Sequence, residues 1–131
     1  MGIRQQYPVT GLLGATTIST ANTLRDGSGT LGDLISAGAH GSLVSGIRVM
    51  ATGTTTEGAI RLFHHDGTTT RLLKELPVMA VTPSATVPAW AGEIDLRDAH
   101  GDPFPLPINH SLKVATERGE TFNVFASGAH F

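Results

Sequence analysis

Two adjacent histidines and an aspartate, His64-His65-Asp66, are the residues of this chain best suited by type to do chemistry. Imidazole and carboxylate groups together can bind a metal ion or move protons near neutral pH. Neighbouring residues of a β-strand point to opposite faces, so His64 and His65 cannot bind one ion from within a strand. Asp66-Gly67 is a pair typical of hairpin turns. The sequence therefore predicts a polar hairpin tip with solvent-facing histidines, and it leaves a metal or pH-sensing role as the alternative.

The other histidines add no metal-ligand motif. Zinc sites take about three or four ligands, and the chain has no cysteine to supply thiolates. The remaining histidines follow no ligand spacing: His40, His100, His110 and His130. We therefore predict no metal-binding residues.

A short acidic stretch is the second candidate ion site. Glu93, Asp95, Asp98 and Asp102 offer the oxygen ligands that calcium prefers. Their order does not match the EF-hand loop, so we expect solvated loop carboxylates, with ion binding as the alternative.

Glycine-rich stretches resemble nucleotide-binding loops only in part. Residues 27–32 match G-x-G-x-x-G, but β-like residues follow where a helix is required. Residues 53–58 have P-loop spacing, but Ala59-Ile60 replaces the required Lys-Ser/Thr. No G-x-S-x-G nucleophile motif occurs. We therefore predict no catalytic residues, no cofactor and no enzymatic activity.

The charge balance narrows the class of partner. Nine Lys and Arg against eleven Asp and Glu give a formal net charge of −2, so nothing favours nucleic acid or an anionic membrane. No apolar run is long enough to span a bilayer, and the first residues have no signal-peptide core. We expect a protein made in the cytoplasm without a signal peptide.

The elements that must position these residues read as β-strands. Short runs rich in Thr, Val, Ile and Leu are separated by Gly, Asp, Asn and Pro, without a helical period. In residues 121–126, Phe122 and Val124 share one face, whereas Thr121, Asn123 and Phe125 share the other. Gly46 indicates a bulge or a close approach of backbones. The expected strands lie within residues 15–22, 30–36, 42–52, 60–63, 71–76, 76–87, 90–96, 111–116 and 121–126.

About eight short strands without helical crossovers favour an all-β fold. We predict an antiparallel β-sandwich, with a jelly roll as the preferred connectivity. Prolines 77, 83 and 88 place residues 76–87 in an edge strand and irregular chain. At 131 residues the chain is one domain, which we expect over residues 14–131. Residues 1–13 fit no strand pattern and are predicted to be an extended N-terminal arm.

Taken as a series, these segments resemble small structural proteins of tailed bacteriophages, including head decoration or cement proteins. The resemblance covers most of positions 20–126, and its pieces are strands and turns rather than catalytic motifs. It rests on residues 22–30, 47–58, 60–63 with Asp66-Gly67, 71–75, 82–86, 112–116 and 120–126.

The resemblance implies a virion component on the outer capsid surface, with the major capsid protein as its partner. Such a protein stabilises the expanded head, and a jelly-roll module can form a homotrimer that suits a local threefold axis. A tail or neck protein, or a module that binds a host receptor or carbohydrate, is the alternative. The expected partner contacts are Arg4, Gln5, Gln6 and Tyr7 of the arm, and Asp102, Pro103 and Phe104 of the proline-rich loop 98–107.

Overall fold

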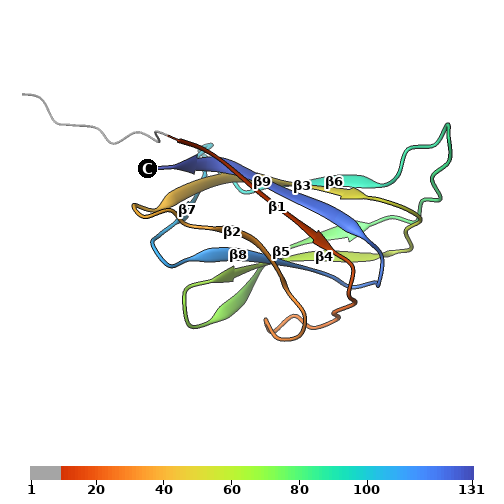
Figure 1. The fold of residues 1–131 in the computed structure, drawn as a ribbon, viewed down its shortest axis with the longest axis horizontal. Coiled ribbons are helices and arrows are strands. Elements are labelled where there is room, and N and C mark those ends of the chain that lie inside the picture. The colour runs from red at the N-terminus through yellow and green to blue at the C-terminus, as the bar shows by residue number, and fades with distance from the viewer. Residues whose placement is uncertain (1–9) are drawn as a thin grey trace, which may run out of the picture.

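The computed structural model describes residues 10–131, which form two packed β-sheets and no helix (Figure 1). Sheet A is the upper layer in Figure 1 and has the strand order β1-β9-β3-β6, with β7 also paired to β3. Sheet B is the lower layer, with the order β2-β8-β4-β5. The strands are β1 (Thr10–Ile18), β2 (Gly32–Ser36), β3 (Ser42–Ala51), β4 (Gly58–His65), β5 (Thr70–Val78), β6 (Ala91–Asp95), β7 (Phe104–Leu106), β8 (Ser111–Thr116) and β9 (Phe122–His130).

Every strand pair within the two sheets is antiparallel, so the predicted antiparallel β-sandwich is confirmed. Side chains alternate along each strand, and one set from each sheet fills the space between the layers. In β9, Phe122 and Val124 are fully buried while Phe125 is exposed, as their alternation predicts. The inward set includes Val44, Ile47, Val49, Ile60, Leu62, Leu106, Leu112 and Val114.

The hairpin predicted at Asp66-Gly67 joins β4 to β5. The Asp66 carboxylate accepts hydrogen bonds from the amides of Thr68 (2.9 Å) and Thr69 (2.7 Å). Gly67 has a φ of 96°, a conformation that favours glycine. The bonds from Thr69 and Thr68, followed by that from Arg71, hold the pKa of Asp66 well below its usual range. The turn therefore uses Asp66 for local structure and not as a metal ligand.

Several predicted boundaries are wrong. The first strand was expected at 15–22 but begins at Thr10 and ends at Ile18, so residues 10–13 belong to a strand and not to an arm. Pairing with β9 overrides the two glycines in this segment that weaken a strand prediction. The loop 98–107 contains the short strand β7, because Phe104 and Leu106 pair beside β3 and point inward.

Two backbone predictions are confirmed. The register of β3 against β9 shifts between Val44 and Gly46, which is the bulge that Gly46 indicated. Pro77 lies in β5, an edge strand of sheet B, and irregular chain follows it to residue 90. Proline is tolerated there because an edge strand has ladder positions that need no amide donor.

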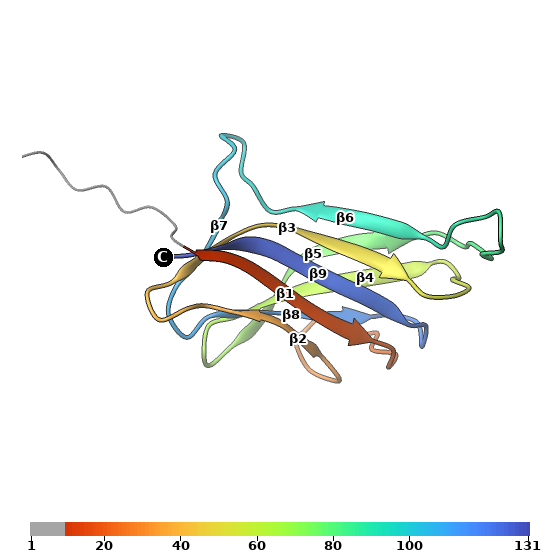
Figure 2. The same ribbon diagram turned by 45° about the horizontal axis from the view of Figure 1, so that its top comes forward.

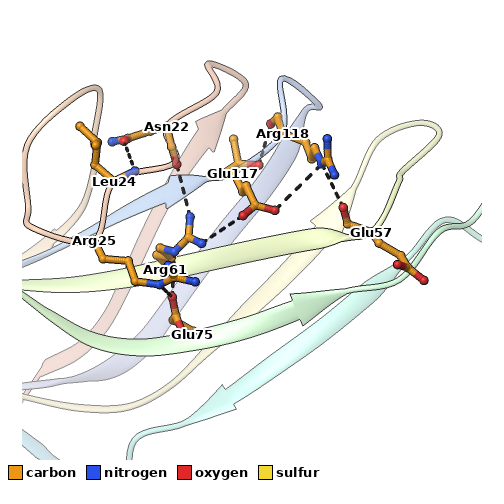
Figure 3. Close-up of polar contacts among 9 residues, drawn as sticks. Asn22, Leu24, Arg25, Glu57, Arg61, Glu75, Glu117 and Arg118 are labelled. Carbon is orange, nitrogen blue, oxygen red and sulfur yellow. Dashed lines mark hydrogen bonds and ion pairs between the residues drawn. The ribbon is translucent and has the colours of Figure 1, made fainter.

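The chain between β1 and β2, residues 19–31, packs on the outside of sheet B around a buried arginine (Figure 3). Arg61 of β4 is 1% exposed. Its guanidinium donates to Glu75 Oε1 (2.8 Å), Glu117 Oε1 (3.2 Å) and the carbonyl oxygen of Asn22 (3.4 Å). Arg25 reaches the same Glu75 oxygen at 2.5 Å. These contacts tie the 19–31 segment to β4, to β5 and to the turn that follows β8.

Within this network, the positive charge of Arg61 and the negative charge of Glu75 stabilise each other. Burial by itself disfavours the charged guanidinium, but the hydrogen bonds and charges of Glu75 and Glu117 outweigh it, so the pKa of Arg61 is raised. The hydrogen bonds from Arg61 and then Arg25 lower the pKa of Glu75. Asn22 also holds the segment's own turn, since its amide donates to the carbonyl oxygens of Ser28 and Thr30. Hydrogen bonds to both side chains and backbone groups of residues 19–31 therefore hold this segment in place.

We expect Arg61→Met to lower the free energy of unfolding by about 2 to 4 kcal/mol, because charge-assisted hydrogen bonds are lost while the half-exposed glutamates partly hydrate. Hydrogen exchange should rise most in residues 19–31. Denaturant unfolding and exchange mass spectrometry measure the two effects. Arg97→Met is the control, since Arg97 bonds only to nearby Asp95 at the surface. Equal effects of the two substitutions would contradict the assigned role of Arg61.

Candidate interaction surface

The outer face of sheet A is uncovered by the described part of the chain, in contrast to the outer face of sheet B. On sheet B, Arg61 and Ala115 point outward and are buried. On sheet A, the outward side chains Met50 of β3 and Phe125 of β9 are exposed, and the ribbon in Figure 2 shows where β3 and β9 lie in this sheet. We call this outer surface of sheet A the open face and define it by Leu13, Arg48, Met50, Glu93 and Phe125.

Strand register explains why these five side chains gather. Phe125 of β9 lies opposite Arg48 of β3, and Arg48 lies opposite Glu93 of β6. Directly opposed residues of antiparallel strands project from the same face. Leu13 and Met50 occupy neighbouring positions of the same outward set on β1 and β3. The result is one patch of side chains, in three adjacent rows, across four strands that are not consecutive in the sequence.

The open face is apolar for a surface in solvent. Leu13 is 70% exposed, Met50 41% and Phe125 39%. Together with Ala91, Ser127 and the Arg48–Glu93 pair they line a shallow groove of about 730 Å³. Contiguous exposed apolar side chains rimmed by polar groups mark binding surfaces more often than isolated ones do. The groove therefore has the composition of a contact surface for another macromolecule.

Arg48 and Glu93 give the open face no net charge. Their side chains approach to 3.7 Å and are 80% and 75% exposed. Such a pair contributes little to folding because water screens it. A partner that covers it would desolvate both charges, so it can set orientation more than affinity. Of the described residues that line the groove, Ser127 and Glu93 are of the types that serve as nucleophile and base, and no hydrogen bond joins them.

The predicted partner contacts are placed only in part. Arg4, Gln5, Gln6 and Tyr7 lie outside the described residues. Asp102 is exposed and Pro103 is half-buried in the loop between β6 and β7. Phe104 is half-buried, because it points between the sheets and packs edge-on against His64 at 5.7 Å between ring centroids. Of the three described residues of this set, Asp102 and Pro103 are therefore the surface groups.

The prediction that the hairpin-tip histidines both face solvent is wrong for His64. Parity separates His64 from His65, as expected, but it turns His64 inward with Ile60 and Leu62. His64 Nε2 lies 2.8 Å from His110 Nδ1, whereas His65 Nδ1 lies 2.8 Å from Thr70 Oγ1. Sequence spacing could not reveal this pair, because it joins β4 to a turn 46 residues away.

The acidic stretch does not assemble into an ion site. Glu93 and Asp95 point outward from β6, while Asp98 caps its own loop by accepting from the amides of His100 and Asp102. Within residues 10–131, no three His, Cys, Asp or Glu side chains are grouped closely enough to hold a metal ion.

In the same range, no helix is long and apolar enough to cross a membrane. The comparisons with family models, curated proteins and solved structures found no match to this chain. The candidate surface therefore rests on the geometry of the chain itself. One feature of the sequence indicated the open face. In residues 121–126, the aromatic Phe125 lies on the same side as the polar residues Thr121 and Asn123.

Two phenylalanines of β9 test which face is free. We expect Phe122→Ala to cost about 3 to 5 kcal/mol of unfolding free energy, because Phe122 is 1% exposed in the core. Phe125→Ala should cost about 1 kcal/mol or less, because its side chain projects into solvent. Denaturant unfolding of the two variants gives both values. A similar loss for Phe125 would mean that the open face is packed against something in the isolated protein.

Proposed function

We propose that this protein is a non-enzymatic structural component of a tailed-bacteriophage virion, and that it binds the outer surface of the major capsid shell as a decoration protein. The observation that carries the proposal is the open face: an exposed, largely apolar sheet surface whose one charged pair, Arg48–Glu93, leaves it without net charge. The resemblance of the strand and turn segments to phage decoration proteins supplies the partner. The open face and the resemblance both favour a protein that acts by binding another protein.

The physics of a shell suits weak, repeated contacts. Each copy needs only modest affinity, because trimers that engage several shell subunits at once gain avidity. A protein that binds only the expanded lattice stabilises that lattice by linkage. The Arg48–Glu93 pair contributes orientation, while Leu13, Met50 and Phe125 contribute apolar contact. In this proposal the open face lies against the shell.

A jelly-roll connectivity and a homotrimer are the finer parts of the proposal. The strand orders β1-β9-β3-β6 and β2-β8-β4-β5 support the first, since consecutive strands repeatedly cross between the two sheets. A closed trimer would place three open faces around one axis and match a local threefold of the shell.

Substitutions on the open face test the shell contact. We expect Met50→Lys with Phe125→Lys to reduce binding to expanded, undecorated particles at least about tenfold, because buried charges replace apolar contact. Met79→Lys is the matched control, since Met79 is 68% exposed and lies outside the open face. Co-sedimentation measures binding, and unfolding curves show that each variant is folded.

Cryo-EM of wild-type particles gives the location. Density on the outside of the head with sheet A facing the shell is the expected result. Density confined to the tail or neck would overturn the decoration role and favour the alternative virion role.

Deletion of residues 1–9 tests the arm. We expect the truncated protein to keep the stability of the full chain, because β1 begins at Thr10. It should lose shell binding if the arm holds a neighbouring subunit. A deletion that extends into β1 is unsuitable, since residues from Thr10 onward pair with β9. Normal decoration by the truncated protein would contradict the arm contact and leave the open-face contact intact.

A further inference from the structure

A histidine pair closes one open end of the sandwich. His64 ends the inward-facing row of β4 and lies in sheet B, whereas Phe104 belongs to β7 of sheet A. The rings of His64 and His110 are 4.9 Å apart between centroids, and His64 also contacts Phe104. Both histidines are half-buried. The apolar space between the two sheets thus ends at two imidazoles instead of a hydrophobic side chain.

The pair anchors the segment that connects β7 to β8. The His110 amide donates to the Pro107 carbonyl oxygen at 3.0 Å, closing a turn in which Asn109 has a φ of 70°. The His110 carbonyl oxygen accepts from the Ala37 amide at 3.0 Å, which ties the connection between β2 and β3 to the same point. One side-chain contact therefore holds β4 against two connecting segments and, through Phe104, against β7.

Charged groups near the pair lie on β4, on the β4–β5 hairpin and on β5, whereas β8 places the uncharged Leu112 opposite His64. On β4 itself, His65 points to the other face; on the hairpin, Asp66 is paired with Arg71, which lies opposite His64 on β5. Phe104 of β7 is uncharged. Burial, followed by the charge of His110, lowers the pKa of His64; Asp66 opposes this and Arg71 adds to it. Asp66 is already engaged by Arg71, so it offers little compensation to a second imidazolium.

We propose that the His64–His110 pair is a pH-sensitive latch, and that double protonation releases the β7–β8 turn, and with it β7 and the loop before it, from β4. With no added proton, one ring N–H donates to the facing nitrogen of the other ring. With one added proton, the imidazolium still donates to the neutral ring. With two, both facing nitrogens carry N–H groups, so the hydrogen bond is lost and two like charges meet in a half-buried space.

The direction of the pH effect follows from linkage. Unfolded histidines titrate near about pH 6.5, and the folded protein binds the second proton more weakly. The pair therefore contributes stability above that pH, and the contribution is lost as the pH falls below it. The released loop contains Asp102 and Pro103, so acid would alter a surface that the proposed function assigns to partner contact. The latch itself does not depend on that role.

Hydrogen exchange and histidine titration of the full chain test the latch. After correction for intrinsic rates, protection of residues 98–110 should fall at least about tenfold between about pH 7.5 and pH 5. The irregular segment 79–90 at the opposite end of the sandwich should show no such change. NMR titration of the ring protons should place the His64 step below the ordinary histidine value, and His110→Gln should move that step.

Matched variants separate the latch from general acid effects. His64→Gln with His110→Gln removes both titrating groups and should abolish the pH dependence in residues 98–110. His100→Gln should keep it, because His100 lies exposed in the same loop and is outside the pair. The latch is wrong if wild type and the double variant lose protection equally, or if the two rings titrate independently near about 6.5. The wild-type titration decides even where the double variant fails to fold.

Discussion

The buried guanidinium of Arg61 is the constraint on which the rest of the structure depends. An arginine on the outer face of a sheet would normally extend into water. Here it is covered, and two glutamates and the Asn22 carbonyl oxygen satisfy it. Removing such a cation from water is costly, so it requires these partners in place. The 19–31 segment is therefore fixed over sheet B by electrostatics and hydrogen bonds more than by apolar packing.

This cover makes the two faces of the sandwich unequal. On sheet B, the 19–31 segment covers the outer face around Arg61 and Ala115, so these outward side chains are buried. Sheet A has no corresponding segment among residues 10–131, and its open face spans four strands. A rigid sheet surface presents such a patch with little loss of side-chain freedom on binding, which favours contact with a partner. The asymmetry supports an interaction role more directly than any single residue does.

The ends of the sandwich differ in a second way. At the end that holds the β7–β8 turn, the core stops at the His64–His110 contact; elsewhere it is built of aliphatic and aromatic side chains. A polar contact of this kind is sensitive to protonation, whereas apolar packing is not. Most of the sandwich is therefore held by apolar packing that does not depend on pH, whereas one end is held by a histidine contact that depends on protonation. Contact with a partner at the neighbouring loop would depend on that state.

The sequence by itself determined the fold class, the hairpin at Asp66-Gly67, the bulge beside Gly46 and the opposite faces of His64 and His65, because these depend on local backbone preference and strand parity. Tertiary structure alone decided which residues meet across the sandwich. Arg61 joins Glu117 over 56 positions, His64 joins His110 over 46, and Leu13 joins Phe125 on the open face through the pairing of β1 with β9. The prediction of solvent-facing histidines failed for the same reason: parity gives the side of a strand, but only the packing of two sheets says which side is the interior.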